Sequence, residues 1–244
     1  MNTSKNNIMT TKNILRIVTV VYSLWVIFCP YKGPRFMIWN LFLAWIPLEV
    51  IDSIIKIDKE NKTNKVIFMN YILWIVWLLF YPNSPYMITD FIHIVSNKYY
   101  LAKPIHLNYA ITNKILFNDN FKIWVDFVNI AIGAWLGYVV GFLSLSKAQQ
   151  LFSRRYGKII SWVIVFLINM ASGFAIYLGR FIRWNSWDVI TNPKNIIVIL
   201  VNNINRKSFN FTILFGIFTF IIYIINHAVR KDNIFIEGEE NFEI

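Results

Sequence analysis

The chain has 244 residues, of which 57% are hydrophobic and only 15% charged, and its net charge is +11. A soluble domain has about 25% charged residues, so the composition excludes an ordinary soluble protein and favours a membrane protein. Lys and Arg then set topology and meet anionic lipid headgroups, and we expect the lipid bilayer, and no nucleic acid, as the partner.

Six apolar segments approach the length of about 20 residues that a helix needs to cross a bilayer. They lie at 12–29, 36–55, 66–81, 123–145, 159–179 and 209–228. No small-x-small cleavage site follows the first segment, so we interpret it as an uncleaved helix. The sequence therefore predicts an all-α, polytopic transmembrane helix bundle of about six spans, with one or two short interfacial helices. These form a single transmembrane domain over residues 1–230.

The first candidate interfacial helix follows the third span. Pro82 ends that span, and Ser84 is a suitable N-cap for a shorter helix from Pro85 to about Ser96. Asp90 and His93 share one face of this helix because they are spaced i and i+3. Residues 97–122 are mixed and polar, and we expect a loop on the membrane surface there. Residues 196–201 are apolar but too short to span, which predicts a second interfacial helix.

The fourth span contains three glycines spaced four residues apart, namely Gly133, Gly137 and Gly141. Such spacing makes a flat strip on one helix face, and we expect another helix to pack closely against it. A hinge is the alternative function for these glycines.

Two further segments are polar. Residues 146–158 carry Lys147, Arg154, Arg155 and Lys158, and we expect a short cytoplasmic loop. With this loop inside, both termini are cytoplasmic. The acidic tail, residues 231–244, is expected to be disordered.

The polar residues that follow spans three and five form the candidate site. This topology brings the residues near 90, the start of span four and the segment 180–188 to the outer membrane face. Arg180 and Arg183, spaced i and i+3, can hold a phosphate or carboxylate bidentately. The candidate binding residues are Arg180, Arg183, Asn185, Asp188, Asp126, Asn83, Trp184 and Trp187, the indoles anchoring the segment at headgroup depth.

Asp90 and His93 are the candidates for catalytic residues. A carboxylate beside an imidazole can serve as an acid/base pair, and the same two groups can equally be the wet face of an interfacial helix. With three histidines and no HExxH motif, we expect no metal and no cofactor. Glu49 and Asp52 suit interfacial positions, with Lys56 as a partner, better than a proton path.

Four stretches resemble one known family. LAWIPLE (43–49), LLFYPNSPYMITDFIH (78–93), WVDF (124–127) and SGFAIYLGRFIRWNSWD (172–188) are similar to the bacterial integral membrane family called domain of unknown function 1361. The resemblance spans about residues 36–190. It implies a multi-pass protein of the bacterial inner membrane and brings no activity with it.

Two hypotheses of different classes follow. In the first, the protein binds or processes an anionic, lipid-like envelope substrate at the outer membrane face, with Arg180 and Arg183 on the anion and Asp90 and His93 as acid and base. In the second, it is a non-enzymatic membrane subunit or transporter component, and the polar cluster is structural. The residues leave enzymatic activity and oligomeric state open.

Overall fold

The computed structural model describes residues 10–31, 33–59, 63–96, 99–107, 110–184, 186, 188–191 and 196–240. The chain divides into two compact units. One consists of Met1–Leu41 and Met87–Gly137, and the other of Phe42–Tyr86 and Tyr138–Ile244.

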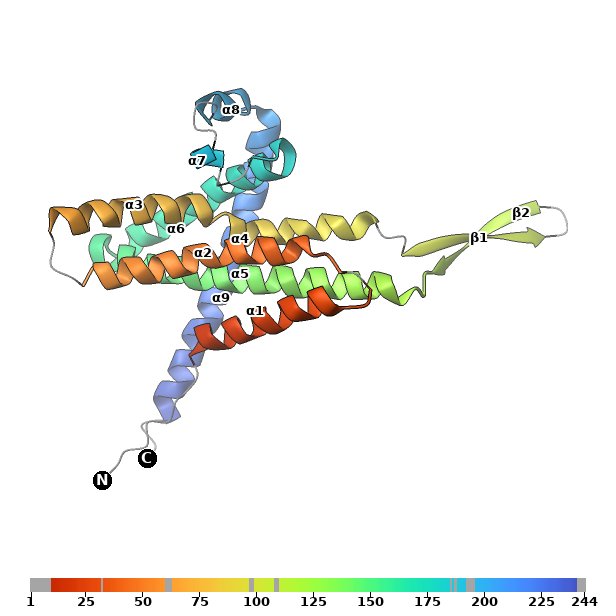
Figure 1. Ribbon diagram of the computed structural model, residues 1–244, viewed down its shortest axis with the longest axis horizontal. Helices are drawn as coiled ribbons and strands as arrows, with labels where there is room; N and C mark the ends of the chain where they lie inside the picture. Colours follow the sequence, from red (N-terminus) through yellow and green to blue (C-terminus); the bar gives the residue numbers. More distant parts are fainter. Residues whose placement is uncertain are drawn as a thin grey trace. The chain divides into compact units, whose positions relative to one another are not determined.

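Helices make up nearly all of the described chain (Figure 1). In order, the elements are α1 (Thr11–Phe28), α2 (Phe36–Ile57), α3 (Asn64–Phe80), α4 (Asn83–Tyr86), the 3₁₀-helix η1 (Met87–Ser96), β1 (Tyr100–Leu107), β2 (Ala110–Phe117), α5 (Phe121–Tyr156), α6 (Lys158–Tyr177), the π-helix η2 (Leu178–Ile182), α7 (Asp188–Thr191), α8 (Ile196–Asn202) and α9 (Arg206–Glu240).

Six of the described helical segments are long and apolar enough to cross a membrane, which confirms the predicted all-α fold class. Their outward side chains are mostly apolar: Phe28, Ile159 and Phe68 are 76%, 82% and 67% exposed. Such exposure suits a hydrocarbon solvent and would be costly over so many residues in water.

Helix α1 packs on α5 through a buried asparagine within the first unit. Asn129 is fully buried, and its backbone oxygen accepts a hydrogen bond from the Tyr22 hydroxyl at 2.9 Å. Its side-chain oxygen accepts another from the indole N–H of Trp25, also at 2.9 Å. These bonds fix the two helices in one register.

The glycine strip of α5 faces close neighbours, as predicted. A methyl group on Gly133 would lie 2.5 Å from the Met37 Cε, and one on Gly137 would lie within 3.1 Å of the Met87 Cγ. At Gly141 it would overlap the Ser84 Cβ. Glycine at these positions therefore allows the neighbouring chain to approach the α5 backbone.

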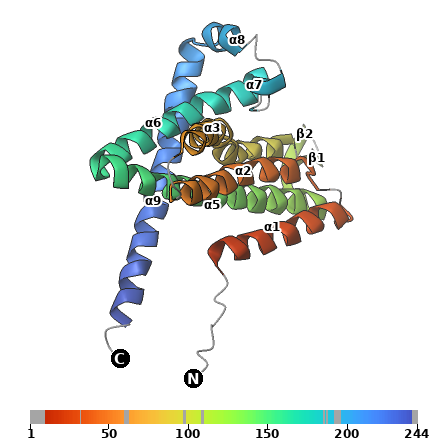
Figure 2. The same cartoon turned by 60° about the vertical axis from the view of Figure 1, so that its left-hand side comes forward.

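Helices α6 and α9 pack together in the second unit, and Figures 1 and 2 show them crossing. A methyl group on Gly173 would meet the backbone oxygen of Thr212 at 2.6 Å and the backbone nitrogen of Gly216 at 2.9 Å. Because the obstacle is backbone, the contact depends on glycine in both helices.

The segment 97–122 differs from the predicted surface loop. Its described part contains an antiparallel hairpin in which β1 pairs with β2, Tyr100 lying opposite Phe117 and Leu107 opposite Ala110. The rings of Tyr100 and Phe117 are 5.0 Å apart. The loop prediction was wrong because backbone pairing between the two halves outweighs their polar composition.

Three helix boundaries also differ from prediction. Ser84 is the second residue of α4 and not an N-cap, and its hydroxyl donates to the Ala44 carbonyl at 3.1 Å. Residues 146–156 belong to α5, so the predicted loop is reduced to Gly157, with φ of +87°. Helix α9 extends to Glu240, ten residues (231–240) into the tail for which disorder was expected; residues 241–244 lie outside the described part.

Candidate functional site

In the second unit, the segment after η2 is held to the turn that follows α3. The Ser186 hydroxyl donates to the Leu79 carbonyl at 2.8 Å. Asn83 in turn donates its side-chain amide to the Phe80 carbonyl at 2.9 Å and to the Ser186 Oγ at 3.1 Å. The two most distinctive stretches of the sequence, around residues 80–86 and 180–188, therefore come together.

Arg180 lies over the aromatic ring of Tyr86. Its guanidinium carbon is 4.4 Å from the ring centroid, within the range of a cation–π contact. The preceding residue eases the approach, since a methyl group on Gly179 would lie 3.2 Å from the Tyr86 Cε2, closer than an ordinary contact. Gly179 thus lets the Tyr86 ring approach the backbone, and the same ring holds the Arg180 guanidinium in place. A stacked guanidinium still directs its N–H donors outward in the plane of the group.

The backbone around Arg180 has two uncommon features. Residues Leu178–Ile182 form a π-helix, a conformation frequent at functional sites. The π-helix ends at Arg183, whose φ of 60° and ψ of 32° are left-handed. This conformation costs a non-glycine residue about 1–2 kcal/mol. The strained backbone conformation therefore coincides with the position of the Arg183 side chain at the end of the π-helix.

A third cation lies nearby and was not predicted as part of the site. The Lys207 ammonium is 4.3 Å from the centroid of the Phe181 ring. Phe181 also meets Phe211 edge to face, with centroids 5.3 Å apart. Lys207 is distant from Arg180 in sequence, and only the packing of α6 on α9 places it at this end of the unit.

The remaining predicted residues of this segment are partly described. Trp184 is half-buried, and its backbone N–H donates to the Leu178 carbonyl at 3.2 Å. Asp188 is half-buried at the start of α7, where its carboxylate accepts a weak bond from the Thr191 hydroxyl at 3.5 Å. Asn185 and Trp187 lie outside the described residues.

Asp90 and His93 form a pair in the first unit. Asp90 is 1% exposed and accepts a hydrogen bond from the Asn40 amide at 2.8 Å. The His93 Nε2 lies 3.8 Å from the other carboxylate oxygen, and the imidazole is 47% exposed. Phe36 packs on this imidazole, with ring centroids 4.7 Å apart. A buried carboxylate therefore lies next to an imidazole that solvent can reach.

Asp126, the other predicted carboxylate of this unit, has a local partner. Lys122 binds it at 2.7 Å, one helical turn earlier in α5. Among the residues that the structure describes, no group of three or more His, Cys, Asp or Glu side chains could hold a metal ion.

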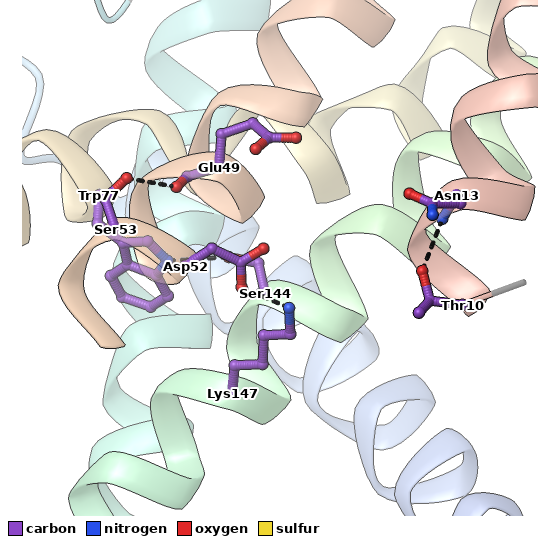
Figure 3. A network of polar contacts seen from close by, with 8 residues as sticks. All are labelled: Thr10, Asn13, Glu49, Asp52, Ser53, Trp77, Ser144 and Lys147. Atoms are coloured by element: carbon purple, nitrogen blue, oxygen red, sulfur yellow. Dashed lines mark hydrogen bonds and ion pairs between the residues drawn. The ribbon is translucent and has the colours of Figure 1, made fainter. Parts of the chain in front are cut away.

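A second set of polar contacts joins helices inside the second unit (Figure 3). Asp52 of α2 pairs with Lys147 of α5, and the Trp77 indole of α3 donates to the Ser144 hydroxyl at 2.9 Å. Toward α9, the Tyr223 hydroxyl donates to the Gln149 side-chain oxygen at 2.6 Å. These contacts tie α2, α3 and α9 to α5, so Asp52 has a partner other than the predicted Lys56.

The fold and these polar clusters define a class: a multi-pass α-helical protein of membrane type, with aromatic and cationic side chains gathered at helix ends. Within that class, the family model described as protein of unknown function (DUF1361) matches residues 39–222, and the chain belongs to this family. Searches of curated proteins and of solved structures give no match.

Proposed function

We propose that this protein binds an anionic, lipid-like envelope compound at the outer face of a bacterial cell membrane, with Arg180 and Arg183 as the anion-binding residues. The observation that carries the proposal is the stacking of Arg180 on Tyr86, at 4.4 Å, inside a π-helix that ends in a left-handed arginine. A guanidinium held by its face recognises phosphate or carboxylate oxygens through its edge.

The surroundings of Arg180 suit an anionic ligand at a membrane. Lys207 adds a further positive charge near Phe181, and the aromatic rings of Phe181 and Phe211 offer an apolar surface for a lipid chain. Trp184 is of the residue type that occupies headgroup depth. The compact Lys and Arg cluster at 147–158 supports a cytoplasmic position for that end of α5 and, by alternation of six spans, an outer position for Arg180.

The experiment compares the wild type with Arg180→Lys by native mass spectrometry after purification in mild detergent. Lysine keeps the charge but loses the planar fork, so we expect a folded, monodisperse variant that retains less anionic lipid. Lys65→Gln, at the other end of the second unit's helices, is the matched control and should retain the wild-type amount. An Arg180→Lys protein with the full complement of anionic lipid would overturn the proposal.

A chemical step is the second candidate, favoured by the buried Asp90 carboxylate beside the exposed His93 imidazole. The pair would act as acid and base on an anionic, lipid-like compound. If it does, Asp90→Asn and His93→Gln should accumulate a bound mass that the wild type converts. Bound masses identical to those of the wild type would leave binding alone.

The alternative is a non-enzymatic membrane subunit or transporter component whose polar cluster is structural. The hydrogen bonds that join Asn83, Ser186 and Leu79 favour this alternative. They hold the segment at Ser186 to the turn after α3 without any contribution from Arg180. In that case Arg180→Lys would lower stability without any separate effect on lipid retention.

A further inference from the structure

A cleft opens at the opposite end of α6 from Arg180, within the second unit. It has a volume of about 540 Å³ and lies between the end of α2, the first half of α3 and the end of α5. This volume is in the usual range for ligand sites, about 300–1,000 Å³. Its lining combines aromatic, aliphatic and charged side chains.

One wall of the cleft is apolar and continues onto the outer surface of α3. Trp74 stacks on Phe152 with centroids 5.1 Å apart and planes at 28°. Tyr71 also lines the cleft, and it begins a stripe of exposed side chains on α3 that continues with Ile75 and Leu78. Because these positions follow helical spacing, the cleft leads directly onto a surface suited to lipid chains.

The polar groups of the cleft carry both signs of charge. Arg154 and Arg155 come from the last turn of α5, and Asp58 follows the last turn of α2. Among the described residues, none forms an ion pair or side-chain hydrogen bond with Asp58 or Arg154, although both line the same cleft. Two guanidinium groups and one carboxylate thus line the same cleft.

Asn70 adds an acceptor that lacks a donor. Its side-chain oxygen is buried and has no hydrogen-bond partner within the described part of the chain. A buried acceptor without a donor is unfavourable, and a ligand N–H or O–H would satisfy it once the Asn70 side chain turns toward the cleft that it lines. The lining of the cleft therefore suits a ligand with two polar groups. One is an anion that binds the arginines, and the other is a cation that donates hydrogen bonds to Asp58 and Asn70.

We propose that this cleft binds a glycerophospholipid with a phosphoethanolamine headgroup. The phosphate would meet Arg154 and Arg155, the primary ammonium would donate to Asp58 and Asn70, and an acyl chain would lie along Trp74 and the exposed stripe of α3. Phosphate geometry suits guanidinium donors, and the ammonium supplies the N–H groups that the two acceptors need. The site is separate from the proposed anion site at Arg180 and does not rest on it.

The test offers the full-length protein an equimolar mixture of phosphatidylethanolamine, phosphatidylcholine and phosphatidylglycerol in detergent, and bound lipid is read by native mass spectrometry. We expect the ethanolamine lipid to dominate. The choline lipid keeps the positive charge but has no N–H donor, and the glycerol lipid lacks the cation. Asp58→Asn should lower retention of the ethanolamine lipid by about tenfold, the effect of one charge-assisted bond, and Arg154→Gln with Arg155→Gln should do the same.

Controls separate this site from the one at Arg180. Lys59→Gln removes a charge next to Asp58 but outside the cleft lining and should leave retention unchanged. Soluble phosphoethanolamine should compete poorly, since it lacks the chain that contacts Trp74. Equal retention of the three lipids, or unchanged retention in both the Asp58 and the arginine variants, would overturn the proposal. Loss of ethanolamine lipid in Arg180→Lys but not in Asp58→Asn would assign the lipid to the other site and also overturn it.

Discussion

Asp52 of α2 and Lys147 of α5 form an ion pair in which the side chains are 22% and 30% exposed. Neither charge is fully solvated, so removal of one leaves the other poorly compensated. We predict that Lys147→Gln lowers the free energy of unfolding by about 1–3 kcal/mol, between the values for exposed and buried pairs. Thermal unfolding in detergent measures it, with the exposed Lys56→Gln as control. The charge exchange Asp52→Lys with Lys147→Asp should recover part of the loss, and a fully stable Lys147→Gln protein would contradict the prediction.

The indole N–H of Trp77, a residue that is 1% exposed, donates a hydrogen bond to the Ser144 hydroxyl. Ser144→Ala leaves its N–H buried without that acceptor and should cost about 1–3 kcal/mol of stability. In a Trp77→Phe background the same substitution should cost much less, since no donor remains. Ser53→Ala is the matched control, because among the described residues the Ser53 hydroxyl bonds within its own helix, to the Glu49 carbonyl. Equal costs of Ser144→Ala in both backgrounds would refute the account.

The glycine strip of α5 offers a graded test of packing. Gly141→Ala places a methyl group against the Cβ of Ser84, which is held by its bond to Ala44, so we predict a loss of about 1–3 kcal/mol. Gly137→Ala meets the flexible side chain of Met87, which can move aside, and alanine favours the helix. Gly137→Ala should therefore be the milder change in thermal unfolding. The reverse order would show that Ser84 yields more easily than Met87.

Arg183 lies in a left-handed conformation that glycine adopts without strain. We predict that Arg183→Gly raises the free energy of unfolding by about 1 kcal/mol while lowering retention of anionic lipid. Arg183→Asn, which tolerates the conformation and lacks the charge, should behave similarly. A variant that loses both stability and lipid would instead identify the Arg183 side chain as a structural staple.

Membrane orientation can be tested with single cysteines in a Cys29→Ser background. Gln150 is exposed on α5, and Asp119 is exposed just before that helix begins. With both termini cytoplasmic, an impermeant thiol reagent added to intact cells should label Asp119→Cys and spare Gln150→Cys. Lysed cells, in which both positions should react, provide the control. The opposite pattern would reverse the proposed outer position of Arg180.

The sequence predicts the six spans well because length and apolar character are local properties. The sequence-based prediction fails where the structure depends on pairing between two strands or on the continuation of a helix through a charged segment. The strands at 100–107 and 110–117 are joined by backbone bonds that neither half signals alone. Residues 146–156 contain no helix breaker, and their charges suggested a loop although Lys, Ala, Gln, Leu and Arg are good helix formers.

For the candidate site, Arg180 could be found from its place after an apolar run. The cation–π contact between Arg180 and Tyr86 could not be found from the sequence, because it depends on the packing of α4 near α6. The position of Lys207 near Phe181 depends in the same way on the packing of α9. Gly179 was the available signal: a glycine directly before an arginine at a helix end indicates that something approaches the backbone there.

The single-residue connection at Gly157 also determines how the protein meets a protease. Trypsin cleaves after Lys and Arg, but it needs an extended, mobile segment that it can draw into its active site, such as a loop tip. Arg154, Arg155 and Lys158 all lie in helices, and the residue between those helices is too short a stretch to be drawn out. This strongly cationic part of the chain therefore resists tryptic digestion for as long as α5 and α6 remain folded. Cleavage after Arg154 or Arg155 would show that the junction between α5 and α6 has unfolded.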